Sequence, residues 1–298
     1  MIEVSSSPDA PAAGAPRVAF QGEAGAFSEE AVAACFGEAA EAVPCREFRD
    51  VGAAVVSGAV DFGLLPIENT LAGGVTGAYD VLVHGGLEVV REVTRPIRHC
   101  LLGAPGSSIE GVRRVISHPV ALAQVARFVA ERPWLQAVAV YDTAGAARDV
   151  AAAADPTLAA VASRQAGRRY GLEVLAADIQ DRADNQTRFL GVARAGAPRP
   201  ADDVVADRWK TMLVAETPNR PGALLELLLP FAERGVNLTK IESRPGEAPW
   251  TYRFFLELDG RAGTPAVDEA LEAVRGGART LRVLGSFPAA VGESAGVA

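Results

Sequence analysis

Short apolar runs alternate with helix-like segments from Arg17 onward. The run RVAF precedes a glycine turn and the segment SEEAVAACF, and VDFGLLPI precedes ENTLAGG and VTGAYDVLVH. The runs VRRVIS, QAVAVYDT and TLAAVA are each followed by a helix-like segment in the same way. Because strands that alternate with helices are typical of parallel sheets with crossover helices, this part of the chain is predicted to be an α/β region.

The last third of the chain has a different order of elements. Beyond residue 208 the pattern predicts β, α, β, β, α and β elements, which is the split arrangement of a ferredoxin-like domain. Their predicted ranges are 209–216, about 222–234, about 236–245, about 250–259, about 266–276 and about 279–287. In the strand WTYRFFLEL, period-2 alternation predicts one apolar face made of Trp250, Tyr252, Phe254, Leu256 and Leu258.

Length and composition indicate two domains. A chain of 298 residues has room for two units that each bury a core. Hydrophobic residues make up 49% and charged residues 22%, as in ordinary globular proteins. We predict a flexible tail at 1–16, a first domain at 17–194, a linker rich in proline, alanine and charge at 195–208, a second domain at 209–288 and a flexible tail at 289–298.

Charge and cysteine content exclude several classes of protein. A formal charge of −8 argues against a surface that binds nucleic acid, although one or two arginines in a cleft could still bind a carboxylate. The chain has no run of 18 apolar residues, and its start does not resemble a signal peptide, so we expect no membrane contact. Three cysteines without a C-x-x-C pair favour a reducing cytoplasm, and three scattered histidines predict no metal site.

Polar residues follow the apolar strand of FGLLPIENTLAGG, which we expect to end at Pro66. Ligands of open α/β sheets usually bind where the carboxyl ends of strands open into a crevice. Glu68, partly shielded at such a place, could act as a proton donor. In the structural alternative, Asn69 and Thr70 cap the next helix and Glu68 is solvated.

Two further turns each have a structural and a functional interpretation. In QGEAGAFSEEA, Ser28 is predicted to cap the following helix, and the acidic residues after it would repel a pyrophosphate, which disfavours a dinucleotide site. In ISHPVALAQ, Ser117 and His118 lie at a strand end and Pro119 begins a helix. The chain contains no G-x-S-x-G sequence, so a hydrolase triad has no support.

The segment DNQTRFLGV places a hydroxyl and a guanidinium directly before a buried strand. In a regular strand, Thr187 and Phe189 should point to one face and Arg188 to the other. Thr187 and Arg188 could therefore serve one ligand only at a strand end or a bulge. The structural alternative makes Thr187 an ordinary strand residue, Arg188 a surface charge and Phe189 part of the core.

The segment NRPGAL opens a helix in the second domain. Pro221 lies near its predicted start and Gly235 near its predicted end. A packed helix explains the apolar stripe that follows. It does not explain Gly222, which would expose helix-start N–H groups able to receive a carboxylate.

Seven blocks of the sequence resemble, in chain order, those of monofunctional bacterial prephenate dehydratases, the enzymes that make phenylpyruvate for phenylalanine synthesis. The blocks are FQGEAGAFSEEA, GLLPIENT, RPIRHCLL, SHPVALAQ, DNQTRFL, RPGALLELLLPFAERGVNLTKIESRP and YRFFLEL. The resemblance extends from Arg17 to Pro288. It implies an α/β fold with a two-lobed catalytic region, similar to periplasmic binding proteins with a cleft between the lobes, followed by a ferredoxin-like βαββαβ ACT regulatory domain.

The resemblance also implies which residues act on prephenate. We expect Arg188 to bind a substrate carboxylate, Thr187 to hydrogen-bond the departing hydroxyl and Glu68 to supply the proton. The residues expected to bind substrate are Asn69, Thr70, Ser28, Ser117, His118 and Phe189. Two positions depart from the usual family pattern, because Ala26 stands for a threonine and Thr70 for a serine. No cofactor or metal is expected, since aromatisation of the substrate ring supplies the driving force.

A regulatory site is implied in the ACT domain, where phenylalanine is expected to bind between two subunits of a homodimer or homotetramer. The residues expected there are Gly222, Ala223, Leu224, Leu225, Asn237, Leu238, Glu242, Ser243, Arg244 and Pro245. The motifs leave other functions open. The protein could use arogenate in place of prephenate, or decarboxylate without aromatisation, or be a non-catalytic metabolite sensor of two lobes.

Overall fold

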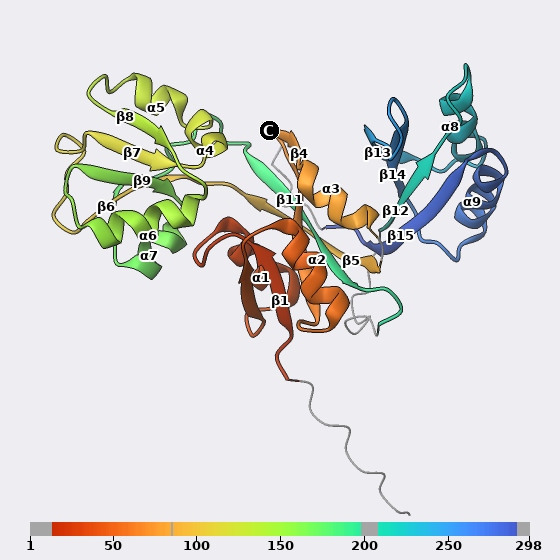
Figure 1. Cartoon of the computed structure of the whole chain (residues 1–298), viewed down its shortest axis with the longest axis horizontal. Helices are drawn as coiled ribbons and strands as arrows, with labels where there is room; N and C mark the ends of the chain where they lie inside the picture. Colours follow the sequence, from red (N-terminus) through yellow and green to blue (C-terminus); the bar gives the residue numbers. More distant parts are fainter. Residues whose placement is uncertain (1–13, 85, 198–207, 291–298) are drawn as a thin grey trace, which may run out of the picture.

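The computed structural model describes residues 14–84, 86–197 and 208–290. In this part of the chain, two α/β lobes and a C-terminal domain lie in a row, with the first lobe in the middle (Figure 1). The predicted tails at 1–16 and 289–298 and the predicted linker at 195–208 fall mostly outside the described residues.

The first lobe is a mixed sheet covered by helices. Its strand order is β2-β1-β3-β11-β5, with the short β4 paired to β3. The prediction of parallel strands holds for β1 with β2 and β3, whereas β11 is antiparallel to both of its neighbours because it returns from the second lobe. The elements are β1 (Arg17–Gln21), α1 (Phe27–Phe36), β2 (Glu41–Cys45), α2 (Phe48–Ser57), β3 (Phe62–Asn69), β4 (Gly73–Gly74), α3 (Thr76–Val83), β5 (Leu87–Pro96) and β11 (Gln186–Arg194).

Strand β3 is longer than predicted, because it continues through Pro66 to Asn69. Pro66 lies opposite Phe189, next to a register shift in the pairing of β3 with β11. A proline cannot donate to a regular ladder and is tolerated at such irregularities. Glu68 and Asn69 are therefore strand residues, and their side chains leave opposite faces of the sheet.

The second lobe is an insertion between β5 and β11, with strand order β10-β6-β9-β7-β8. Its elements are β6 (Cys100–Gly103), β7 (Arg114–Ser117), α4 (Pro119–Ala123), α5 (Ala126–Ala130), β8 (Gln136–Ala139), α6 (Thr143–Ala153), β9 (Leu158–Ala162), α7 (Arg164–Tyr170) and β10 (Glu173–Ala176). The chain crosses between the lobes twice, at 97–99 and at 177–185. The two crossings are hydrogen-bonded to each other, from the Ile179 N–H to the His99 carbonyl at 3.0 Å.

The C-terminal domain has the predicted βαββαβ order, and its sheet has the strand order β13-β14-β12-β15. The predicted boundaries lie within about two residues of the observed ones, the usual uncertainty of element ends. The elements are β12 (Trp209–Glu216), α8 (Ala223–Glu233), β13 (Leu238–Pro245), β14 (Tyr252–Asp259), α9 (Pro265–Gly277) and β15 (Thr280–Pro288).

Trp250 does not belong to the apolar face of β14, and that prediction is wrong. It lies before the strand, with a φ of 61° and 83% of its surface exposed. A turn accounts for this position, because Thr251 N donates to the Ala248 carbonyl at 3.2 Å and Gly246 N donates to the Thr251 carbonyl at 2.7 Å. Leu256 and Leu258 face helices α8 and α9, as the alternation predicts.

The other face of the C-terminal sheet packs against the first lobe. One continuous core contains Met212, Val214, Phe255, Leu284 and Phe287 from this sheet and Leu65, Tyr79, Leu82 and Val89 from the first lobe. Burial of each phenylalanine contributes roughly 1.5–3 kcal/mol. The backbones also approach closely, since a Cβ on Gly285 would lie 2.2 Å from the Val89 carbonyl oxygen. Only glycine fits at that position, which keeps β15 directly against β5.

Candidate active site

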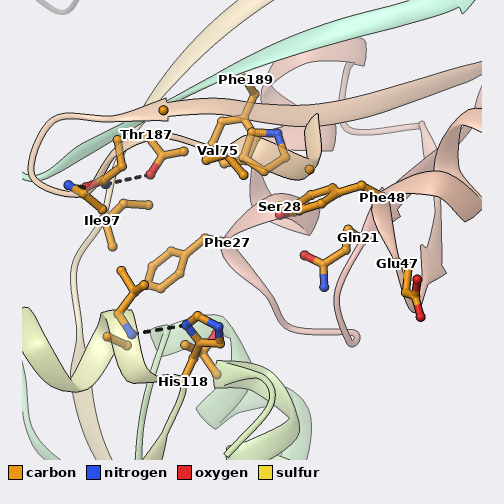
Figure 2. Close-up of a pocket in the computed structure, with 18 of the residues that line it drawn as sticks. Gln21, Phe27, Ser28, Glu47, Phe48, Val75, Ile97, His118, Thr187 and Phe189 are labelled. Atoms are coloured by element: carbon orange, nitrogen blue, oxygen red, sulfur yellow. Dashed lines mark hydrogen bonds between the residues drawn. The ribbon is translucent and has the colours of Figure 1, made fainter. Parts of the chain in front are cut away.

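A cavity of about 760 Å³ lies between the two lobes. Side chains of the first lobe form its upper part and residues of the second lobe form its floor in the close-up (Figure 2). The lining includes Gln21, Phe27, Ser28, Phe48, Val75, Ile97, Thr187 and Phe189 on one side, and His118, Val120, Ala121, Gln124 and Thr143 on the other. The predicted cleft between two lobes is therefore present.

The cavity contains only part of the predicted site. The predicted residues that line it are Thr187, Asn69, Ser28, His118 and Phe189. The predicted residues that do not line it are Glu68, Arg188, Thr70 and Ser117. Alternation along β3 and β11 accounts for the division at Glu68 and Arg188, because each of these residues is the sequence neighbour of a cavity residue.

The Thr187 hydroxyl is held by the amide of Asn69. Asn69 Nδ2 lies 3.0 Å from Thr187 Oγ1, 2.8 Å from Asn185 Oδ1 and 3.0 Å from the Gln186 carbonyl oxygen, so its two hydrogens are shared among three acceptors. Asn69 Oδ1 accepts from the N–H groups of Leu71 and Ala72 at 3.0 and 2.9 Å. These partners fix which end of the amide faces Thr187, so Thr187 Oγ1 is an acceptor in this pair and its own hydrogen is directed elsewhere.

Gln124 and His99 extend this network, and the sequence reasoning missed both. Gln124 Nε2 donates to Asn69 Oδ1 at 3.3 Å, and Gln124 Oε1 lies 2.8 Å from His99 Nε2. Since Gln124 Oε1 can only accept, His99 carries its hydrogen on Nε2. Burial lowers the pKa of His99, although the hydrogen bond to Gln124 opposes this effect, so the ring is neutral at physiological pH. Both residues lie inside blocks that the family resemblance covers, but nothing in their spacing singled them out.

Thr70 and Ser117 have structural partners in place of a ligand. Thr70 Oγ1 donates to the Asp184 carbonyl at 3.0 Å and accepts from Gln186 N at 3.0 Å, which ties the end of β3 to the start of β11. Ser117 is fully buried, and its hydroxyl donates to the Val161 carbonyl at 2.6 Å. Neither residue lines the cavity, and a contact of either one with substrate stays a prediction.

Ser28 lines the cavity but does not cap α1, so the prediction of an N-cap is wrong. The N-cap is Ala26, which has no hydroxyl to offer the helix start. The carboxylate of Glu29 accepts from the N–H of Gly25, in the turn that precedes the helix. Ser28 is thereby left to face the cavity, next to Phe27 (Figure 2).

His118 faces the cavity from the second lobe (Figure 2). It is the N-cap of α4, where Pro119 begins the helix as predicted, and its Nδ1 accepts from Val120 N at 3.3 Å. A neutral ring therefore carries its hydrogen on Nε2, which is available to a ligand. Arg46 and Arg49 also line the cavity. Arg49 is paired with Glu47 at 2.9 Å, whereas Arg46 makes no ion pair with any residue that the structure describes.

Glu68 and Arg188 lie on the opposite face of the first-lobe sheet from Thr187. Arg188 Nη1 is 2.7 Å from Glu257 Oε1 and 3.1 Å from Glu92 Oε1, and Glu68 Oε1 is 2.9 Å from Lys240 Nζ. The expectation that Glu68, Arg188 and Thr187 surround one small molecule is therefore wrong. The register shift lies after Arg188 and leaves it on the face that strand alternation dictates.

The predicted effector residues belong to two segments of the C-terminal domain, the start of α8 and the strand β13 with the residue before it. Gly222 is the N-cap of α8 with a φ of 83°, and the exposed Leu224 and Leu225 follow it. A separate pocket of about 230 Å³ is lined by Ala223 and Leu224 together with Trp250, Tyr252 and others, but not by residues of β13. The predicted residues of β13 include Leu238, Glu242, Ser243, Arg244 and Pro245, and Asn237 precedes the strand.

No helix in the described part of the chain is long and apolar enough to cross a membrane. Among the same residues, no group of three or more histidine, cysteine, aspartate or glutamate side chains is arranged to hold a metal ion.

The fold and the cavity define a two-lobed α/β protein with a ligand site between its lobes and a C-terminal βαββαβ domain. Residues 18–197 match the family described as prephenate dehydratase, and residues 211–276 match the family described as ACT domain. The chain belongs to the prephenate dehydratase family, whose members are lyases, and it carries an ACT domain.

Relatives with established names agree with this assignment. The chain is 42% identical to arogenate dehydratase/prephenate dehydratase 2, chloroplastic, of Arabidopsis thaliana, over 91% of this chain and 72% of the relative. It is 37% identical to the bifunctional chorismate mutase/prephenate dehydratase of Stutzerimonas stutzeri, over 92% of this chain and 74% of the relative.

Two solved structures have the same overall fold. The prephenate dehydratase from Arthrobacter aurescens in complex with L-Phe superposes with a TM-score of 0.84 at 35% identity, over 92% of this chain and 90% of that chain. GqqA, described as a novel type of quorum quenching acylase, superposes with a TM-score of 0.83 at 35% identity, over 92% of this chain and 98% of that chain.

Proposed function

We propose that the protein converts prephenate to phenylpyruvate, with loss of water and carbon dioxide, in the cavity between its lobes. The proposal rests on membership of the prephenate dehydratase family and on one observation in the cavity. Thr187 Oγ1 accepts a hydrogen bond from Asn69 Nδ2 at 3.0 Å, so its hydrogen is available to a ligand. The monofunctional character suggested by the sequence stays a prediction.

The reaction requires that the two breaking bonds of prephenate be aligned and that the departing hydroxyl oxygen be stabilised. In prephenate, the bond between the ring and its carboxylate breaks and carbon dioxide leaves. The electron pair of that bond enters the ring while the bond to the ring hydroxyl breaks at the opposite carbon. The oxygen departs with its own electron pair and takes up a proton to become water. Since the product ring is aromatic, the enzyme chiefly has to align these bonds and stabilise the oxygen as it leaves.

We assign Thr187 to that oxygen. A donor that points at the position where negative charge develops lowers the barrier, and a fixed donor does not have to reorient during the reaction. Asn69 fixes Thr187, and Gln124 fixes Asn69. A threonine hydroxyl is too weak an acid to protonate the leaving oxygen without another source.

His118 and Arg46 replace Glu68 and Arg188 in the proposed roles. His118 faces the cavity from the second lobe, and we propose that its Nε2–H donates a second hydrogen bond to the leaving oxygen, which takes its proton from solvent. Arg46 lies on the cavity lining without an ion-pair partner in the described chain, and its planar guanidinium suits a carboxylate. The two carboxylates of prephenate would thus meet a cation that the protein has not already neutralised.

The test is Thr187→Val, which keeps the shape of the side chain and removes the hydroxyl. Phenylpyruvate formation is followed by its enolate absorbance in alkali. We expect a fall in kcat of roughly 10²–10³-fold, as for removal of one preorganised donor, and partial recovery in Thr187→Ser. Thr143→Val is the matched control, because Thr143 is also a threonine of the cavity lining. Unchanged turnover in a folded Thr187→Val protein would falsify the assignment.

The choice between prephenate and arogenate is a separate question. The Arabidopsis relative is named for both activities, so the family alone does not decide it. We propose prephenate, because Arg46 offers a positive charge at the cavity rather than a site for the ammonium group of arogenate. Parallel assays with the two substrates decide it, since a higher kcat/KM with arogenate overturns the proposal.

We also propose that phenylalanine regulates the enzyme through the ACT domain. The support is the ACT domain itself and the bound L-Phe in the Arthrobacter aurescens structure. An effector can change activity only if its affinity differs between two arrangements of the protein. Calorimetric titration of phenylalanine, with activity and gel filtration in the same buffer, tests both binding and the predicted homodimer or homotetramer.

A further inference from the structure

A buried ion cluster joins the ACT domain to the strand that carries Thr187. Arg188 Nη1 lies 2.7 and 2.8 Å from the two carboxylate oxygens of Glu257 and 3.1 Å from Glu92 Oε1. Lys210 Nζ lies 3.0 Å from Glu92 Oε1 and 3.1 Å from Glu257 Oε1. The four residues come from four strands: β11 and β5 of the first lobe, and β14 and β12 of the ACT domain.

The cluster is balanced in charge and almost closed to water. Two cations face two carboxylates, and the side chains of Glu257 and Glu92 are only 1% and 2% exposed. Burial alone would raise the pKa of Glu257, but the hydrogen bond and charge of Arg188 and the charge of Lys210 lower it overall, so the group stays ionised. Removing one member leaves an uncompensated charge in the interior.

Thr187 and Asn69, which both line the cavity, each have a sequence neighbour that forms an ion pair with the ACT domain. Thr187 precedes Arg188, which binds Glu257, and Asn69 follows Glu68, which binds Lys240 at 2.9 Å. Arg188 and Glu68 are also register partners in the pairing of β11 with β3. The ACT sheet therefore holds, from one side, the same two strand segments that present the amide and hydroxyl to the cavity on the other side.

Arg188 depends on a single nitrogen for its position. Its Nε and Nη2 are buried and have no hydrogen-bond partner in the described chain, so Nη1 alone holds Glu257 and Glu92. Without Glu257, the guanidinium would be drawn toward Glu68, whose Oε2 lies 3.8 Å from Arg188 Nε. Such a movement pulls on β11 next to Thr187, at the point where its register with β3 already shifts.

We propose that Glu257 of the ACT domain is a positioning residue of the catalytic cavity. Through Arg188, it keeps β11 in the register at which Asn69 Nδ2 meets Thr187 Oγ1. It touches neither the cavity nor the substrate, and it acts only by holding the strand. The inference rests on the proposed role of Thr187, and it gives the ACT domain a part in the reaction even without an effector.

The test compares Glu257→Gln with Glu216→Gln in the full-length protein. Glu216 is a matched control, since it lies in the ACT sheet and binds Arg253 Nε at 2.8 Å, away from the cluster. We expect kcat for prephenate to fall about 2- to 30-fold in Glu257→Gln with KM little changed, the range for remote coupling, and to stay within about twofold in the control. Glu257→Asp, which keeps the charge on a shorter side chain, should recover part of kcat.

A second readout does not depend on activity. Hydrogen exchange of the β11 amides near Thr187 should become faster in Glu257→Gln than in the wild type, and should stay unchanged in Glu216→Gln. Unchanged kcat and unchanged exchange in a folded Glu257→Gln protein would overturn the inference, as would an equal fall in kcat in the control. If Glu257→Gln does not fold, Glu257→Asp carries the same comparison. A wild type that leaves prephenate intact rejects the proposed function, whereas the exchange result still decides whether Glu257 holds β11.

Discussion

The two faces of the β3 and β11 pair differ in the kind of polar chemistry that they carry. On the cavity face, Asn69, Thr187 and Gln124 are uncharged and connected by hydrogen bonds. On the opposite face, Arg188 and Glu68 are charged and paired with ACT residues. The same two strands thus provide a neutral network for the ligand and an ionic contact between domains.

The difference has a physical reason. A neutral amide network keeps its geometry across a wide range of pH, because none of its members gains or loses a proton. A buried ion pair contributes little net stability after its desolvation cost, but it strongly penalises any arrangement that leaves one charge unpaired. The first kind of contact suits the alignment of a reacting group, and the second suits the fixed register of two domains.

Asn69→Asp should have the largest effect on the neutral hydrogen-bond network of the cavity face. Ionised aspartate can only accept hydrogen bonds, so Thr187 would turn its hydrogen toward residue 69 and away from the ligand. We expect kcat to fall roughly 10²–10³-fold, similar to removal of the donor itself. Asn219→Asp, an exposed site of the ACT domain, is the control in the same assay. Wild-type turnover in a folded Asn69→Asp protein would refute the fixed-donor account.

Arg188→Met tests how much the buried ion cluster on the opposite face contributes to stability. Glu257 and Glu92 would then share only Lys210, and one buried carboxylate would lack a counter-charge. The free energy of unfolding should fall by about 3–5 kcal/mol. Arg220→Met, which removes a half-exposed pair with Glu226, should leave the free energy of unfolding nearly unchanged, because an exposed ion pair is screened by water.

Denaturant unfolding of both variants measures the difference. The double variant Arg188→Met with Glu257→Met should regain part of the lost stability, because it also removes a stranded charge. The ionic account fails if Arg188→Met costs no more stability than the exposed control.

His99 gives the smallest effect and tests whether the cavity network stays neutral. Burial lowers the pKa of His99 below its ordinary value of 6.5, so the unfolded chain binds this proton at a higher pH than the folded chain does. The free energy of unfolding should therefore fall as the pH drops below about 6.5, by at most about 1.4 kcal/mol per pH unit from this group. His99→Gln should flatten that dependence.

The comparison variant for this measurement is His84→Gln, since His84 is exposed. Urea unfolding between pH 7 and pH 5 gives the slopes. Burial raises the pKa of Asp142, so this group acts in the opposite direction wherever it titrates. Only the difference between wild type and variant therefore reports on His99, and equal slopes in wild type and His99→Gln contradict a histidine that is buried in the neutral form.

Local patterns predicted much of the fold. Alternation and turn residues gave the βαββαβ order of the C-terminal domain, because both signals act over a few neighbouring residues. Trp250 was assigned wrongly because a turn with positive φ interrupts the alternation there. The antiparallel direction of β11 was not predicted, since it depends on the second lobe being inserted before that strand.

The site was predicted in part. Strand ends correctly indicated that Asn69 and Thr187 line one cavity, and alternation correctly indicated that Arg188 points away from Thr187. Arg188 was assigned to the substrate because the sequence does not show what covers the opposite face of the sheet. Its partner there is Glu257 of the ACT domain, which lies 69 residues further along the chain. Gln124 and His99 were missed because one glutamine and one histidine in apolar surroundings carry no distinctive spacing.

The position of β11 between β3 and β5 has a consequence for the order in which the protein can be built. Residues 17–96 are synthesised before residues 186–194, and β3 and β5 are joined only by the later strand β11. The second lobe is contiguous from Cys100 to Ala176, so its strands can pair before β11 has joined β3 to β5 in the first lobe. A nascent chain that stops short of residue 186 therefore lacks both the central strand of this sheet and the Thr187 hydroxyl, and the sheet and the cavity lining are completed by the same short stretch of synthesis.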